Sequence, residues 1–306
     1  MRISTNSIFE AASNRLNDLQ TKIDNVSQQV STGRRILSPS DDPVSAAKVI
    51  EMQTSQAINS QLAKNIAHLE ANYGVVDAKL TGIIDTLQGV NEHVISAANS
   101  TYNDNDRAAI AITLQGYYDQ LLSLANSSDG AGHYLFAGKK TDAEPFVVNQ
   151  DGAVSYVGSS SQSYIQIDNS RVMETSVLGN QLFSDGDIFN KLQTAITALK
   201  KPATEQNANE LRKTALDALA SSFATTFSMV TNAQSYMGIK LKSLDNVKSL
   251  NDNIDLQFSQ NLSRLQDVDY NKAISDLNKQ QLVLQAAQKT FAQTSRLSLF
   301  DYINFN

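Results

Sequence analysis

Apolar residues recur in two stripes, one at each end of the chain. In the N-terminal stripe the spacing alternates between three and four residues, which places the residues on one narrow face of a helix, as in a coiled coil. The N-terminal stripe consists of Phe9, Ala12, Leu16, Leu19, Ile23, Val26 and Val30. The C-terminal stripe consists of Ile254, Phe258, Leu265, Ile274, Leu277, Leu284 and Phe291. Because a single stripe needs a partner to be buried, we expect the two ends to pair with each other, or with copies of themselves in an assembly.

Capping signals set the boundaries of the first two helices. Ser7 followed by Glu10 is a capping-box pattern and predicts the start of the first helix. Gly33 predicts its end, because glycine readily adopts the left-handed conformation found after helices. Asp42 is expected to cap a second helix whose first residue is Pro43, where the missing N–H has no cost. The adjacent acids Asp41 and Asp42 are therefore interpreted as capping groups rather than as a catalytic pair.

The second helix is predicted to run from about residue 44 to 100. Its stripe consists of Leu62, Ile66, Leu69, Tyr73, Val76, Leu80, Ile83, Leu87, Val90, Val94 and Ala97. Three internal glycines each oppose this helix by up to ~1 kcal/mol, so packing of the stripe must outweigh them. The NDND run at 103–106 ends the helix, and a third helix follows with Ile110, Leu114, Tyr117, Leu121 and Leu124.

The pattern changes between residues 134 and 183. Seven of the thirteen glycines fall between 130 and 186. Residues 164–167 alternate in polarity with a period of two, which indicates a strand, and Asp151-Gly152 lies between two apolar runs, which indicates a hairpin. Helical patterns return at 188–199 and again from about 205 to 265.

The predicted fold is mainly α, with long coiled-coil-like helices formed by both chain ends and a small β-rich inserted domain. We divide it into a terminal helical assembly region (1–40 plus 265–306), a helical rod domain (41–138 plus 186–264) and a β-rich outer insert (139–185). Because glycines mark both ends of the insert, we expect those ends to lie close together. We also expect the helical part to keep its fold without it.

Composition narrows the function classes. With 306 residues, a net charge of −6 and a pI near 5.1, nucleic acid is not expected as a main partner, since neutralising phosphates needs a basic face. The absence of cysteine excludes disulfides and thiolate chemistry. No apolar run reaches the ~18–20 residues that span a bilayer, so membrane insertion is not expected. The N-terminus has no apolar core typical of a cleaved signal peptide.

The sequence offers no convincing catalytic set, and we expect no enzyme activity, no cofactor and no metal site. His68 and His93 fall within the long helix and His133 follows the third helix, where structural roles are far more common. A remote alternative is a glycan-active enzyme in the insert, which needs two acids flanking a groove. The acids available for this are Asp142, Glu144, Asp151, Asp168, Glu174 and Asp185.

The last helix has an unusual surface. Residues 278–295 contain five glutamines, with Lys279 and Lys289 as the charged residues. An exposed helix normally carries more charge, so contacts on several sides are expected, and assembly is favoured over burial within the chain's own domain. The predicted assembly interface consists of Leu16, Leu19, Ile23, Val26, Val30, Ile274, Leu277, Leu284 and Phe291.

Several segments resemble the flagellin superfamily. These are MRISTNSIF and LNDLQTKIDNVSQQVSTGRRILSPSDDPVSAAKV near the start, and DYNKAISDLNKQQLVLQAAQKTFAQTSRLSLFDYI at the end. STGRRI before SPSDDP, HYLFAGKKTDAEPF and the ending SLFDYI resemble more narrowly the members that form the junction between hook and filament. The middle helices resemble that family in their general helical character alone.

The resemblance implies a structural component of the bacterial flagellum, which joins the hook side to the filament through its terminal helices. The implied partners are copies of itself in a ring, a neighbouring hook-associated protein, flagellin, and a cytoplasmic export chaperone on the C-terminal helix. The implied location is extracellular, reached through type III export without a cleaved signal. A short filament flagellin is the near alternative.

Overall fold

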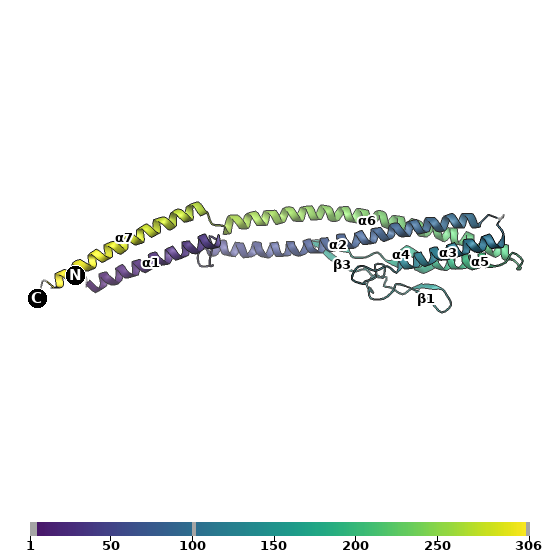
Figure 1. The fold of residues 1–306 in the computed structure, drawn as a ribbon, viewed down its shortest axis with the longest axis horizontal. Coiled ribbons are helices and arrows are strands. Elements are labelled where there is room, and N and C mark those ends of the chain that lie inside the picture. Colours follow the sequence, from purple (N-terminus) through teal and green to yellow (C-terminus); the bar gives the residue numbers. More distant parts are fainter. Residues whose placement is uncertain (1–4, 100–101, 304–306) are drawn as a thin grey trace. The chain divides into compact units, whose positions relative to one another are not determined.

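The structure, a computed structural model, describes residues 5–99 and 102–303. Its long helices are α1 (Thr5–Thr32), α2 (Pro43–Ala97), α3 (Asp104–Ala125), α5 (Asp187–Lys200), α6 (Ala208–Gln266) and α7 (Tyr270–Ile303) (Figure 1). The chain divides into two compact units. We call them the terminal unit (Met1–Asn59 and Asn253–Asn306) and the central unit (Ser60–Asp252). Helices α2 and α6 contribute residues to both.

The predicted boundary between the first two helices is confirmed. Helix α1 ends at Thr32, and Gly33 follows with a φ of +71°, a conformation that favours glycine. Helix α2 begins at Pro43, and the Ser45 N–H donates to Asp42 Oδ1 at 3.1 Å. The predicted start of α1 is wrong, since the helix is already formed at Thr5. Ser7 therefore lies inside the first turn rather than at the capping position.

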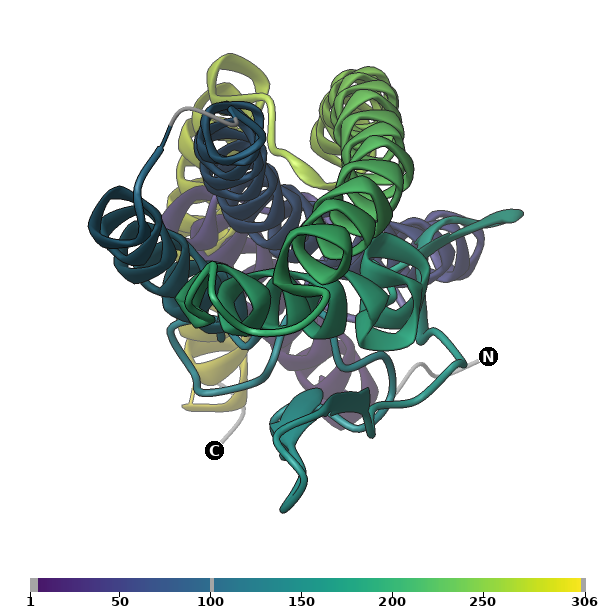
Figure 2. The ribbon, with the colours of Figure 1, turned by 90° about the vertical axis from the view of Figure 1, so that its right-hand side faces the viewer.

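The long stripe of α2 forms the core of the central unit. All eleven residues predicted for this stripe are buried, from Leu62 to Ala97. Ten of them, from Ile66 to Ala97, pack with α3, α5 and α6 in one cluster, and Figure 2 shows helices of this unit nearly end-on. The glycines of α2 have different environments. A Cβ on Gly89 would lie 2.6 Å from the Tyr117 ring, whereas one on Gly74 would meet nothing within 4 Å. Close packing of α2 against α3 thus explains why residue 89 is a glycine, but it does not explain the glycine at position 74.

The NDND run starts a helix as well as following one. The Asn103 side chain accepts from the Asp106 N–H at 2.9 Å, and the Asp106 carboxylate accepts from the Asn103 N–H at 3.1 Å. This reciprocal capping box begins α3, which buries Ala111, Leu114, Tyr118, Leu121 and Ala125. Of the predicted stripe, Ile110, Tyr117 and Leu124 are half-buried beside these residues.

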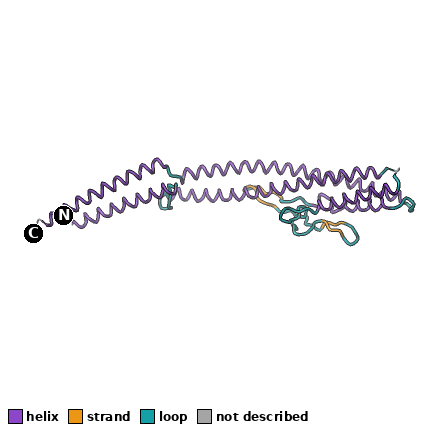
Figure 3. Tube along the Cα trace, in the orientation of Figure 1, coloured by secondary structure: helices purple, strands orange, loops and turns teal. Residues whose placement is uncertain are grey.

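Two small antiparallel hairpins occupy the predicted β-rich segment (Figure 3). Strand β1 (Phe146–Val148) pairs with β2 (Val154–Tyr156), and β3 (Tyr164–Asp168) pairs with β4 (Arg171–Glu174). Gly152, with a φ of +81°, lies in the first turn, which confirms the hairpin. Helix α4 (Gly179–Phe183) and a short 3₁₀ turn (Ser184–Gly186) lead into α5.

The β-rich segment shares its core with the helices. Phe146 of β1 is buried, and its ring centroid lies 5.2 Å from Tyr156, 5.3 Å from Phe183 and 5.5 Å from Phe189 of α5. Its backbone also exchanges two hydrogen bonds with the Asn126 side chain, at 2.8 and 2.9 Å. The expectation that the helices keep their fold without the segment stays a prediction, and this packing weighs against it, because removing the segment would expose the aromatic core.

A buried ion pair anchors the second hairpin to α6. Lys240 is 6% exposed, and its Nζ lies 2.7 Å from Glu174 Oε2. The Tyr73 hydroxyl of α2 donates to the Glu174 carbonyl oxygen, and Asn72 Nδ2 donates to the Thr175 carbonyl at 2.8 Å. The hydrogen bond from Lys240 holds the pKa of Glu174 below its ordinary value, whereas burial raises the pKa of Tyr73. The hairpin is therefore held by both long helices.

Candidate assembly interface

Helices α1 and α7 pair antiparallel within the terminal unit (Figure 1). Near their outer ends the Phe9 and Phe291 rings lie 5.0 Å apart. Eight of the nine predicted interface residues are half-buried, namely Leu16, Leu19, Ile23, Val26, Val30, Leu277, Leu284 and Phe291. The expectation that the chain ends pair with each other is confirmed. The role of these residues in assembly stays a prediction.

The stripe of α7 differs from the predicted one at its first position. Ile274 is 47% exposed, whereas Ala273 beside it is buried. The remaining inward positions of α7 follow the same alternation, and Gln280 and Ala287 are half-buried. The sequence held this signal, because a step of four back from Leu277 reaches Ala273. Alanine is a weaker apolar signal than isoleucine, so the sequence pattern favoured Ile274.

The terminal unit buries few apolar residues and exposes many. Among its described side chains, the buried apolar residues are Ala46, Val49 and Ala273. Nine large apolar residues are exposed there, namely Phe9, Val44, Ile50, Ile58, Leu256, Tyr270, Ile274, Leu282 and Val283. Single exposed apolar residues are ordinary, but this imbalance in one unit is typical of a surface that is covered by a partner.

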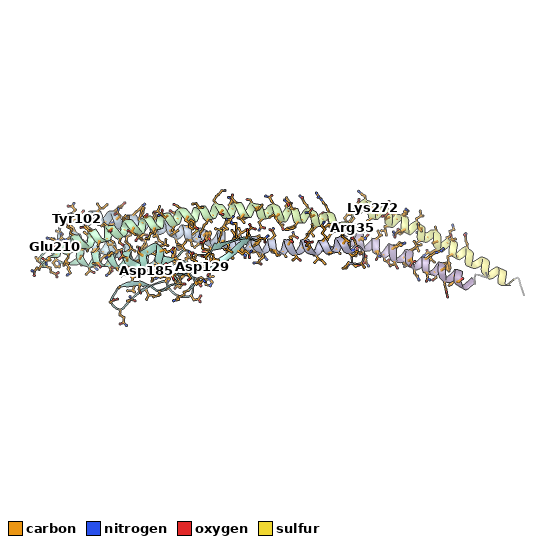
Figure 4. All side chains as sticks on the ribbon, turned by 180° about the vertical axis from the view of Figure 1, so that it is seen from behind. Arg35, Tyr102, Asp129, Asp185, Glu210 and Lys272 are labelled. Atoms are coloured by element: carbon orange, nitrogen blue, oxygen red, sulfur yellow. The ribbon has the colours of Figure 1, made fainter. Side chains whose placement is uncertain are left out.

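Two breaks in the helices meet at one place in the terminal unit, which we call the Arg35 joint (residues 33–42 and 265–270). Figure 4 labels Arg35 in this joint and Lys272 just beyond it, in the first turn of α7. The Arg35 N–H donates to the Gln266 carbonyl at 2.6 Å, and the Val268 N–H donates to the Gly33 carbonyl at 3.0 Å. Backbone pairing thus connects the α1–α2 connection with the α6–α7 connection.

Each helix that leaves the joint has an aspartate at its N-terminus. Asp42 accepts from the first turn of α2, and Asp269 Oδ1 accepts from the Lys272 N–H of α7 at 3.1 Å. The hydrogen bonds from Ser45 lower the pKa of Asp42. Asp41 instead accepts from the Leu37 and Ser38 N–H groups at 3.0 and 2.8 Å. Both acids of the SPSDDP segment are therefore occupied by backbone donors.

The residues considered for catalysis have different environments in the described part of the chain. His68 is exposed, the His93 ring lies 5.6 Å from the Tyr117 ring, and His133 Nδ1 lies 3.3 Å from Asp129. Four of the six acids in the β-rich segment are exposed, namely Asp142, Glu144, Asp151 and Asp185. Asp168 is half-buried, and Glu174 is paired with Lys240.

The described residues offer neither a metal-binding cluster nor a membrane-spanning helix. They contain no group of three or more histidine, cysteine or acidic side chains placed to hold a metal ion. No described helix has a stretch long and apolar enough to cross a membrane.

The paired ends match known helical families. Residues 3–141 match the bacterial flagellin N-terminal helical region, and residues 221–303 match the bacterial flagellin C-terminal helical region. The first region includes α1, α2 and α3, and the second includes most of α6 together with α7. The fold and the paired ends thus define a protein of the flagellin class.

Full-length relatives narrow the class. The chain is 34% identical to flagellar hook-associated protein 3 of Salmonella typhimurium, over 98% of this chain and 99% of the relative. It is 33% identical to flagellar hook-associated protein 3 of Escherichia coli, with the same coverage. A Vibrio parahaemolyticus structure assigned as a flagellar hook-associated protein matches with a TM-score of 0.68 at 23% identity, over 74% of this chain and all of that one. The chain belongs to the flagellar hook-associated protein 3 family.

Proposed function

We propose that this protein is a structural component of the bacterial flagellum that joins the hook side to the filament. The observation that carries the proposal is the terminal unit, which exposes nine large apolar residues and buries three apolar residues among its described side chains. Burying a large apolar side chain contributes about 1.5–3 kcal/mol, so covering this surface with a partner would stabilise the assembly. Family membership makes flagellar subunits the partners that cover it.

The proposed assembly uses both ends of the chain. The stripes of α1 and α7 cover each other, and the outward faces of these helices contact neighbouring subunits. Leu282 and Val283 of α7 are 67% and 43% exposed, and they lie in the glutamine-rich segment where low charge was predicted to accompany contacts on several sides. The partners are copies of this chain in a ring, a neighbouring hook-associated protein and flagellin.

Export completes the proposal. The chain leaves the cell through the flagellar type III apparatus without a cleaved signal peptide, and its location is extracellular. A cytoplasmic chaperone covers the C-terminal helix before export. The same exposed apolar residues of α7 are suited to this, because they need a cover before assembly as well as after it.

Deletion of the gene tests the proposal. The account predicts that the deletion strain makes hooks without attached filaments and releases flagellin into the medium, as measured by electron microscopy and by immunoblotting of the supernatant. A strain that instead makes no filament protein would support the alternative of a short filament flagellin. Filaments that remain attached and of normal length would contradict the junction function.

Leu282 and Val283 provide the matched residue-level test. Replacing both with serine should abolish filament attachment while the purified protein keeps its helical circular dichroism, because both side chains are exposed. The control replaces Gln281 and Gln285 with serine, which are exposed polar neighbours on the same helix. Attachment that survives the apolar substitutions would show that this face makes no essential contact.

A further inference from the structure

The apolar stripes of α1 and α7 do not by themselves fix the axial alignment, or register, of one helix against the other. In α1, Leu16, Ile23 and Val30 are seven residues apart, and Leu19 and Val26 repeat this spacing. In α7, Leu277, Leu284 and Phe291 are also seven residues apart. A slip of seven residues, about 10 Å along the helix, would place leucine, isoleucine or valine opposite an equivalent residue over most of the seam.

Polar groups inside the seam do not resolve the ambiguity. A single buried polar residue that finds a polar partner commonly fixes the register of a coiled coil. Gln280 is the polar member of the α7 stripe, but its buried Oε1 has no hydrogen-bond partner in the described structure. Another feature of the terminal unit must therefore select the register.

The Arg35 joint has the geometry to do so. The Arg35 guanidinium donates from Nη2 to the Leu265 carbonyl at 3.0 Å and from Nη1 to Asp42 at 3.2 Å. The first contact caps the C-terminus of α6, where a cation is favoured by the helix dipole. The second holds the aspartate that caps α2. The Arg35 carbonyl also accepts from Gln29 Nε2 of α1 at 2.7 Å, so one residue connects three helix ends.

We propose that Arg35 is a register-setting residue, which fixes the axial alignment of α1 against α7 by clamping the two helix breaks to each other. A slip of the pair must be absorbed by one of the two connections or by unwinding of a helix end. The α6–α7 connection has three residues, Asp267 to Asp269, and the α1–α2 connection has ten, residues 33–42, which Arg35 ties to α6 and to Asp42. The caps on α6 and α2 oppose these changes. The proposal concerns folding of the chain itself and stands whether or not the proposed function is correct.

Spin-label distances in the full-length protein test this inference. The chain has no cysteine, so labels at N14C and S275C attach specifically. Both positions are exposed, and they are offset along the pair, so a slip of about 10 Å changes their separation by several ångströms. The parent protein should give one narrow distance distribution. R35A should add a second, discrete distance, and R35K should give an intermediate result, because an ammonium cannot bridge two acceptors as the planar guanidinium does.

R34A is the matched control. Arg34 is adjacent, exposed and equal in charge, and within the described residues its side chain makes no hydrogen bond or ion pair to α6. It should keep the parent distribution. A narrow parent-like distribution in R35A would overturn the proposal. A broad distribution with loss of helical circular dichroism would also overturn it, because Arg35 would then stabilise the helices without selecting a register.

Discussion

Replacing Phe146 with alanine tests whether the β-rich segment and the helices share one core. The Phe146 side chain is 1% exposed and contacts aromatic rings on β2, α4 and α5. Truncating a buried phenylalanine costs about 3–5 kcal/mol, from lost transfer energy and from the cavity left behind. The central unit has about 190 residues, for which each kcal/mol shifts the melting temperature by about 2–4 °C. The expected decrease is therefore about 6–20 °C.

The assay is thermal unfolding followed by circular dichroism at 222 nm, which reports on the helices. Val148→Ala is the control, because this residue lies on the same strand but is 48% exposed, and it should change the free energy of unfolding by less than about 1 kcal/mol. If Phe146→Ala leaves the helical transition unchanged and raises hydrogen exchange in β1 and β2 alone, the segment folds independently and the reasoning is refuted.

Three further predictions concern single sites. Gly74→Ala should raise the free energy of unfolding in urea by about 0.5–1 kcal/mol, whereas Gly89→Ala should lower it, because a tyrosine ring occupies the space; equal effects would be inconsistent with the packing. Lys240→Met should lower the free energy of unfolding by about 1–3 kcal/mol, because it leaves the Glu174 carboxylate unpaired although partly hydrated. It should also raise the pKa of Glu174 in an NMR titration, and an unchanged pKa would contradict the pairing. Hydrogen bonds from the first turn of α2 lower the pKa of Asp42. The stabilisation that the Asp42 carboxylate gives to α2 is therefore complete above the unfolded pKa of ~3.9, and it is lost as the pH falls through the lower pKa of the folded state. Amide hydrogen exchange at the N-terminus of α2 should accelerate over this pH range in the parent protein but not in D42N. Equal acceleration in both proteins would contradict this role of Asp42.

The helices could be predicted because their signals are periodic and local. The eleven-residue stripe of α2 is buried throughout, and the caps at Asp42 and Gly33 lie where turn chemistry placed them. Periodicity also contained a signal that was missed. Lys240 lies three residues after Met237 and four before Leu244, so it occupies a stripe position. A lysine at such a position indicates a buried partner, which the structure shows to be Glu174.

The contacts between distant segments could not be predicted in this way. Phe146, Phe183 and Phe189 lie in three different elements, and no period relates them, so the aromatic cluster appears only when the chain is folded. Arg35 is similar, because its acceptors lie on Asp42 and on the end of α6, about 230 residues away. The expectation of a separable insert took no account of such contacts, since glycine-marked boundaries describe the backbone and not the packing of side chains across it.

Locating the protein on intact flagella tests the central claim most directly. Immunogold electron microscopy with an antibody against this chain should place label at one position on each flagellum, between the hook and the filament. The deletion strain is the control for antibody specificity. Label distributed along the whole filament would contradict the junction function and support a filament subunit, and label absent from flagella would contradict a flagellar role altogether.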